Sequence, residues 1–281
     1  MVTDEILVRN ISQSSAMKSL KLAHTKQSTE HLHGLQIQGA SARSIADSVP
    51  KENTNIWSAT IETTSTSLHN FARKALLQVL PTASNLFRWG RLSDPSCPLC
   101  ACGNAQTNKH VLSNCSSATA LRRYTSPHDG VLGLLLSWLR SVVPESCAIY
   151  TDLGSVSGTL PVCDLFINYR PDIAVMKGKE FHTWELTVCP ETNMVKSREY
   201  KENKYRLLDK ATTSQSGGRK TFTHTIEVST LGFVSNMLDF TKSLKLALPI
   251  TLKKSIILTV LKSSFKIYCE RNQSTNITSV I

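Results

Sequence analysis

Hydrophobic residues recur at helical spacing in the first half of the chain and form short strand-like runs in part of the second half. Between Thr66 and Leu80 they lie three to four positions apart, which predicts a helix that ends before Pro81. A strongly apolar segment predicts another helix over 131–143, stopped by Pro144. Residues 1–55 are rich in Ser, Thr and Gln and have only weak helical periodicity, which predicts a loose helical arm.

After Pro161 the pattern changes to short runs of β-branched and aromatic residues, which are typical of strands. Such runs lie at 162–168, 173–176, 181–188 and 223–228. A polar stretch separates the last two runs, and two helical patterns, at 234–248 and 252–268, follow them. Together these elements predict a mixed α/β sheet over about 126–250. We expect Trp89 and Trp138 in the core.

The chain of 281 residues is long enough for a sizeable core, and it carries a net charge of +11. Two stretches, 196–220 and 241–271, are net +5 and +6, and the remainder balances to zero. This surplus favours an acidic partner, either nucleic acid or an anionic membrane surface, although solvated helix faces would explain it equally well. No apolar run is long enough to span a membrane, and the first residues do not form a secretory signal, so we expect neither.

Four of the eight cysteines lie close together, and the other four are scattered as expected for buried thiols in a reducing compartment. Cys97, Cys100, His110 and Cys115 supply three thiolates and one imidazole, a set that suits tetrahedral zinc. One alternative is a chance cluster of buried cysteines. Another is a redox Cys-x-x-Cys pair, but no strand is predicted before it, as such motifs have. Cys102 is left out of the quartet.

Two acidic residues in the strand-rich region suggest a second metal site. Asp172, in the sequence Arg170-Pro171-Asp172, and Glu185 lie on neighbouring predicted strands, where their carboxylates can converge on a hard cation such as Mg²⁺. Such a cation assists phosphodiester hydrolysis, as in the PD-(D/E)xK nucleases. The usual third residue of that pattern is a lysine, but here the position holds Thr187. Ordinary carboxylates at strand ends explain the same pair.

Six motifs in a fixed order make the combination more specific than either site. They are LPTASNLFRW (80–89), CPLC…HVLSNC (97–115), LRRYTSPHDGVL (121–132), RPDIAV…WELTVCPETN (170–193), KENKY (201–205) and TIEVSTLGF (225–233). This order resembles the C-terminal region of site-specific non-LTR (LINE-type) retrotransposon reverse transcriptase proteins. The resemblance implies a helical linker, a structural Zn²⁺ knuckle and a restriction-like endonuclease that nicks DNA for target-primed reverse transcription. No polymerase motif is found, so the chain looks like the tail of such an element.

The resemblance assigns roles residue by residue. The zinc ligands are Cys97, Cys100, His110 and Cys115, and the ligands of a catalytic Mg²⁺ are Asp172 and Glu185. Two lysines three positions apart, Lys201 and Lys204, share one face of the following helix and would replace the missing third residue. Expected nucleic-acid contacts are Arg122, Arg123, His128, Arg170, Arg198, Tyr205 and Arg206. Pro127 stands where the family's Arg-His-Asp/Asn motif has arginine, a departure that weakens DNA contacts.

These observations predict an α/β protein: a helical arm and linker (1–92), a CCHC zinc knuckle (93–125), a PD-(D/E)xK-like mixed sheet flanked by helices (126–250) and a basic C-terminal helix (251–281). The expected activity is Mg²⁺-dependent DNA endonuclease activity in the nucleus. The expected partner is DNA, with the element's RNA as a second candidate and no membrane. Two alternatives stay open, namely a non-catalytic nucleic-acid-binding module and a folded remnant without a function of its own. Oligomeric state is not predicted.

Overall fold

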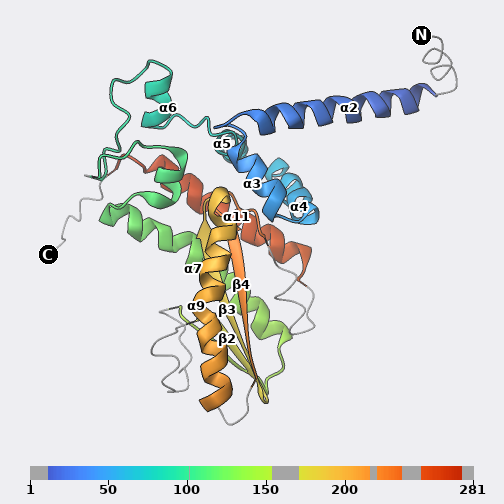
Figure 1. Cartoon of the computed structure of the whole chain (residues 1–281), viewed down its shortest axis with the longest axis vertical. Helices are drawn as coiled ribbons and strands as arrows, with labels where there is room; N and C mark the ends of the chain where they lie inside the picture. The colour runs from blue at the N-terminus through green and yellow to red at the C-terminus, as the bar shows by residue number, and fades with distance from the viewer. Residues whose placement is uncertain (1–11, 101, 154–170, 216–219, 236–247, 274–281) are drawn as a thin grey trace.

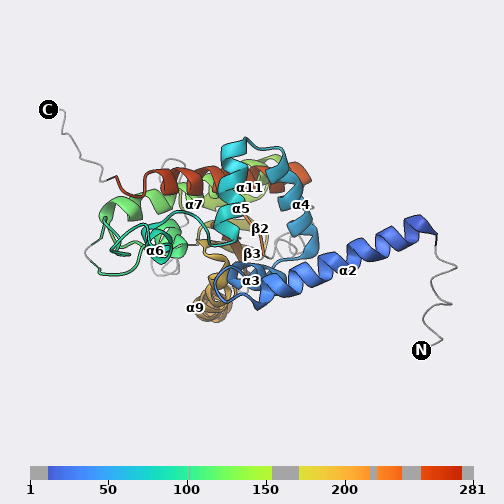
Figure 2. The same cartoon turned by 90° about the horizontal axis from the view of Figure 1, so that it is seen from above.

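The computed structural model describes residues 12–100, 102–153, 171–215, 220–235 and 248–273 (Figure 1). The first of these ranges is helical, with helices α2 (Gln13–Gly34), α3 (Ala40–Ser48), α4 (Lys51–Glu62), α5 (Thr66–Leu76) and α6 (Ala83–Arg88). Helix α2 has no buried residue and projects from the body of the molecule (Figures 1 and 2). The expectation of a loose arm therefore holds for α2.

Helices α3 and α4 differ from that expectation because they pack into a core. Ile45, Trp57 and Ile61 are buried, and the Trp57 ring stacks on Phe233 with 4.2 Å between centroids. The Trp57 indole also donates a hydrogen bond of 2.6 Å to the Leu231 carbonyl. These contacts join the helical half of the chain to the segment after the last strand, a pairing that local periodicity does not reveal.

A four-stranded sheet in the order β1-β2-β3-β4 forms the second half. Its strands are β1 (Ala148–Thr151), β2 (Ile173–Lys177), β3 (Glu180–Cys189) and β4 (Lys220–Ser229). The first three are antiparallel neighbours, and β4 pairs parallel to β3. Helix α9 (Met194–Gln215) makes the crossover between these parallel strands. Three of the four predicted strands are thereby confirmed, whereas the one predicted at 162–168 lies outside the described residues.

Helices cover both faces of this sheet. Figures 1 and 2 show α9 on one face, and α7 (Ala118–Val142) with α11 (Ile250–Cys269) on the other. Side chains from α7, α11 and the sheet form one buried apolar cluster, and α3, α4, α5 and the knuckle form a second. Helix α11 contributes to both, through Val260 in the first and Leu261 in the second. It therefore holds the two halves together.

Three of the four predicted helices lie within the described residues. Those at 66–80, 131–143 and 252–268 are confirmed as α5, the end of α7 and α11, although α7 begins thirteen residues earlier and runs through Pro127. The one at 234–248 falls largely outside the described residues. Trp138 is buried as expected, but Trp89 is 40% exposed because α6 lies at the surface. No helix in the described ranges is long and apolar enough to cross a membrane.

Candidate functional site

The four predicted zinc ligands lie together. The ligand atoms of Cys97, Cys100, His110 and Cys115 are all within 4.8 Å of one another. The Cys97 and Cys115 sulfurs are 3.9 Å apart, and the Cys100 sulfur is 3.4 Å from His110 Nε2. A zinc tetrahedron with ordinary bond lengths has S···S and S···N edges of about 3.8 and 3.6 Å. The quartet therefore fits zinc.

Two local turns bring these ligands together. The first is a tight loop in which Ser96 bridges to Ala105, and the Cys97 N–H donates to the Asn104 carbonyl at 3.0 Å. The second is a π-helical turn over His110–Asn114. Because a π turn advances more residues than an α turn, His110 and Cys115 reach the same side although five positions separate them. The π turn thus places both ligands beside the Cys97–Cys100 loop.

Burial and hydrogen bonds stabilise the arrangement of the four ligands. Burial raises the pKa of Cys97 to about 11, so this sulfur needs a cation to stay a thiolate at neutral pH. The Tyr124 hydroxyl accepts a hydrogen bond from the Cys115 N–H and donates to the Val111 carbonyl, at 3.1 and 2.9 Å. Tyr124 thus ties α7 to the ligand turn. Cys102 is exposed and stands outside the quartet.

The two predicted catalytic acids also come together. The β2–β3 register pairs Ile173 with Trp184, which places Asp172, just before the start of β2, opposite Glu185. Burial raises the pKa of Glu185, and the charge of Asp172 raises it further. Only 2% of the Glu185 side chain is exposed, and its Oε1 has no hydrogen-bond partner. A buried carboxylate that is repelled by a second carboxylate and keeps a free oxygen suits a hard cation.

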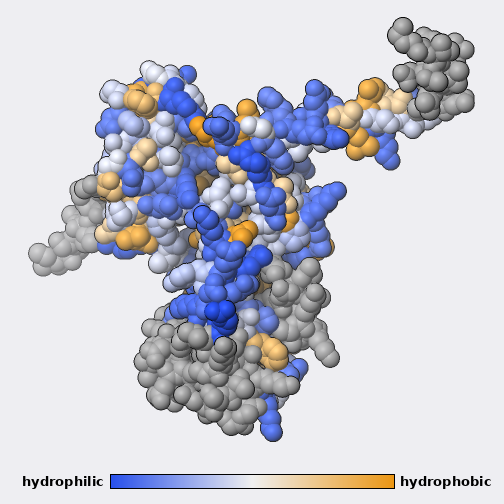
Figure 3. All heavy atoms as spheres, in the orientation of Figure 1, coloured by the Kyte–Doolittle hydropathy of each residue, from blue (hydrophilic) through white to orange (hydrophobic). Residues whose placement is uncertain are grey.

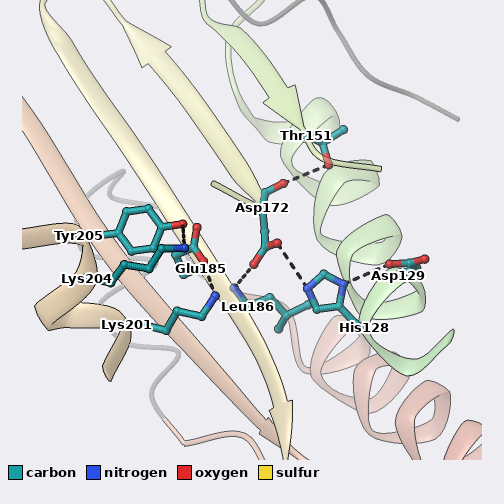
Figure 4. Close-up of polar contacts among 9 residues, drawn as sticks. All are labelled: His128, Asp129, Thr151, Asp172, Glu185, Leu186, Lys201, Lys204 and Tyr205. Carbon is teal, nitrogen blue, oxygen red and sulfur yellow. Dashed lines mark hydrogen bonds and ion pairs between the residues drawn. The ribbon is translucent and has the colours of Figure 1, made fainter. Parts of the chain in front are cut away.

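Three elements hold Asp172 in place (Figure 4). Its Oδ2 accepts the Leu186 N–H of β3 at 2.7 Å, and its carbonyl accepts the Thr151 hydroxyl of β1 at 3.2 Å. Its Oδ1 lies 3.4 Å from His128 Nε2 on α7. Burial alone would lower the pKa of His128, but the carboxylates of Asp172 and Asp129 outweigh it and raise that pKa. His128 therefore faces Asp172.

The two lysines of α9 take different positions. Lys201 Nζ donates to Glu185 Oε2 at 2.5 Å, whereas Lys204 Nζ reaches the Tyr205 hydroxyl at 3.3 Å and lies over its ring (Figure 4). The Tyr205 side chain is fully buried beside Glu185, and burial and that carboxylate both raise its pKa. Lys201 is thus in direct contact with an acid of the site, and Lys204 is one step removed.

Comparison with known proteins bears on the zinc-ligand quartet. A family model described as zinc-binding in reverse transcriptase matches residues 40–121. The match includes the whole ligand quartet, covers less than a third of the chain and ends before the acidic site. A comparison with curated proteins gives no match. The chain thus carries a zinc-binding region of the kind associated with reverse transcriptases, which supports a structural Zn²⁺ and a relation to retrotransposon proteins.

The predicted nucleic-acid contacts differ in how far their side chains are exposed. Arg123 on α7 pairs with Glu270 at 3.2 Å and donates to two carbonyls after α11, so it fastens one helix to the other. Tyr205 has no exposed surface with which to meet nucleic acid. Arg122 and Arg206 are exposed, and Arg170 lies outside the described residues.

Arg198 has a partner that the sequence did not suggest. Its Nε and a terminal nitrogen are each 3.0 Å from Oε2 of Glu227, a residue of β4 with 1% of its surface exposed. Ser235 joins the same group, donating to Glu227 and accepting from Arg198. The sequence holds one sign of this contact, a single acidic residue in a strand that is mostly apolar and Thr residues. Arg198 thus neutralises a buried charge between α9 and the sheet.

Replacing Arg198 with alanine should therefore lower the free energy of unfolding by about 3 kcal/mol, because Glu227 would be left buried without a countercharge. Arg206→Ala, on the same helix but exposed, should change it by less than about 0.5 kcal/mol. Urea denaturation followed by circular dichroism measures both. Equal stability of the two variants would show that the Arg198–Glu227 pair contributes nothing.

Proposed function

We propose that the chain is a divalent-metal-dependent DNA endonuclease of the PD-(D/E)xK type, from a retrotransposon-derived protein, that nicks target DNA. The observation that carries the proposal is the convergence of Asp172, Glu185 and Lys201 from three elements, at the point where β2 begins beside the middle of β3. Helix α9, which connects the parallel strands β3 and β4, supplies Lys201. This supports the proposal, because the strand position that holds the lysine in the usual PD-(D/E)xK pattern is Thr187 here.

Each side chain then has a defined task. A cation such as Mg²⁺, held by Asp172 and Glu185, would activate water and offset charge on the phosphodiester. The Lys201 ammonium holds the Glu185 carboxylate in place and adds positive charge beside the phosphate oxygens as negative charge develops on them. His128 and the Leu186 N–H fix the orientation of the Asp172 carboxylate.

The direct test is nicking of supercoiled plasmid by the full, zinc-loaded chain. Open-circular DNA should accumulate with Mg²⁺ and should not accumulate when Ca²⁺ replaces it. If the chain binds plasmid but leaves it supercoiled with both Mg²⁺ and Mn²⁺, the nuclease proposal fails. The non-catalytic nucleic-acid-binding module would then be the better description.

The different positions of the two lysines give a graded prediction. Lys201→Ala should slow nicking about 100-fold, because it removes the cation in contact with Glu185. Lys204→Ala should slow it less than about tenfold, because Lys204 reaches Tyr205 instead. Initial rates on plasmid measure both variants, and melting temperatures control for folding. A larger loss in Lys204→Ala would contradict this arrangement.

A further inference from the structure

Helix α6 and the loop after it present a continuous exposed stretch of chain. Every residue from Phe87 to Asp94 is exposed, and three of them are large and apolar. Phe87, Trp89 and Leu92 are 48%, 40% and 43% exposed. Figure 3 shows orange atoms beside pale and blue ones over α6 at the upper left. An exposed group of this size and composition marks an interaction site.

The backbone beneath this surface is firmly held. The Asn85 side chain donates to the carbonyls of Gln78 and Leu80 at 2.9 and 2.7 Å, and the Ala83 N–H donates to the Gln106 side chain at 3.0 Å. Helix α6 ends in a pair of hydrogen bonds, from Arg91 N–H to Leu86 and from Gly90 N–H to Phe87. Gly90 has a φ of +69°, the left-handed conformation that this kind of helix end requires. The exposed rings are therefore presented by an ordered platform.

Two arginines lie next to the exposed rings along the chain. Arg88 and Arg91 are both exposed, and the Arg91 guanidinium lies 6.0 Å from the centre of the Trp89 ring. From residue 63 to residue 128 the chain has seven Arg or Lys and one acid, Asp94. This basic segment was hidden in the overall charge because acids outnumber basic residues in 129–195 and 221–240. The surface thus combines stacking groups with a field that attracts polyanions.

We infer that Phe87, Trp89, Arg88, Arg91 and Leu92, the α6 platform, bind an unpaired DNA strand. Aromatic rings stack on unpaired bases whatever their sequence, and guanidinium groups contact the phosphates between them. An apolar protein partner would not need a surface with this sign of charge. The choice of DNA rests on the proposed function, because the end of a nicked strand can separate from its duplex and so supply unpaired bases.

Trp89 gives this site its own optical signal. Of the four tryptophans, Trp57, Trp138 and Trp184 are buried, so Trp89 is the one that a stacked base can quench. The experiment titrates the full, zinc-loaded chain with oligodeoxythymidine in the absence of Mg²⁺, so that binding is measured without cleavage. Wild type should show saturable quenching, and a duplex oligonucleotide should quench far less because its bases are already stacked.

The variants separate stacking from charge and from folding. Because these variants lack the reporting ring, their affinities are measured by the fluorescence anisotropy of end-labelled oligodeoxythymidine, with wild type measured in the same way. Trp89→Ala should weaken binding at least about fivefold, whereas Trp89→Phe should stay within about twofold because phenylalanine still stacks. Replacing Arg88 and Arg91 with glutamine should flatten the dependence of log Kd on log salt. Leu20→Ala, at an exposed apolar position of α2, is the matched control and should bind as wild type does.

Three results would overturn the inference. The first is equal affinity of Trp89→Ala and wild type for the oligonucleotide. The second is tighter binding of RNA than of DNA of the same sequence. The third is a wild-type dimer that becomes a monomer on gel filtration in Trp89→Ala, without any change in DNA binding. The last would make the platform an interface between two copies. A chain that quenches on DNA but never nicks plasmid would remove the proposed nuclease and keep the platform.

Discussion

Replacing Cys97 with serine is expected to release zinc and to lower the melting temperature by about 10 °C or more. The physical reason is that the ligand loop has little core of its own, since the small buried cluster beside it consists of Cys97, Cys115 and Ala120 of α7. Metal binding then provides most of the folding free energy of such a loop, roughly 10 kcal/mol in isolated zinc-finger peptides. Zinc content by mass spectrometry of metals and thermal unfolding by circular dichroism measure the two effects.

Cys102→Ser is the matched control for this prediction. Cys102 lies in the same loop and is exposed, and the quartet forms without it. The variant should keep one zinc per chain and melt within about 2 °C of wild type. If Cys102→Ser lost zinc while Cys97→Ser kept it, the ligand set would have to be redrawn. A chelator should reproduce the effect of Cys97→Ser on the wild-type chain.

Replacing Asp172 with asparagine, or Glu185 with glutamine, is expected to reduce plasmid nicking at least about 100-fold. Each change removes a charged ligand from a site where cation binding supplies several kcal/mol of transition-state stabilisation, and every 1.36 kcal/mol is a factor of ten in rate. The shapes of the side chains hardly change, and the Leu186 N–H keeps an acceptor at position 172. DNA binding and zinc content should therefore match wild type.

Glu180→Gln controls for the loss of a charge on the same strand. Glu180 begins β3, is half exposed and contacts His182 instead of the acidic pair. Its variant should nick at the wild-type rate. Nicking by Asp172→Asn at an undiminished rate would mean that a contaminating nuclease, or another part of the chain, is responsible.

How far the sequence predicts this molecule depends on the range of the interaction. Helix α5, helix α11 and strands β2 to β4 were predicted because their apolar periodicity is local. The zinc quartet was predicted because its ligands lie within two short turns. Strand β1 was missed, since a strand of four residues gives too short a pattern.

Contacts between distant segments could not be predicted in this way. The residues around Arg198 in the sequence do not indicate that its guanidinium pairs with Glu227, which lies on a later strand. Nothing near Trp57 announces the Leu231 carbonyl, 174 positions away. Trp89 was expected in the core because large aromatic residues usually are, yet α6 rests on the fold through Ala83 and Asn85 and turns its rings outward.

The position of α11 in both apolar clusters has a consequence for synthesis on the ribosome. Residues 250–269 are translated after all the helices and strands they pack against, and they contribute Val260 to one cluster and Leu261 to the other. Neither half can complete its core until this helix has left the exit tunnel. A nascent chain that stalls before Ile250 would therefore expose apolar surface on both halves at once, which is the state that chaperones bind.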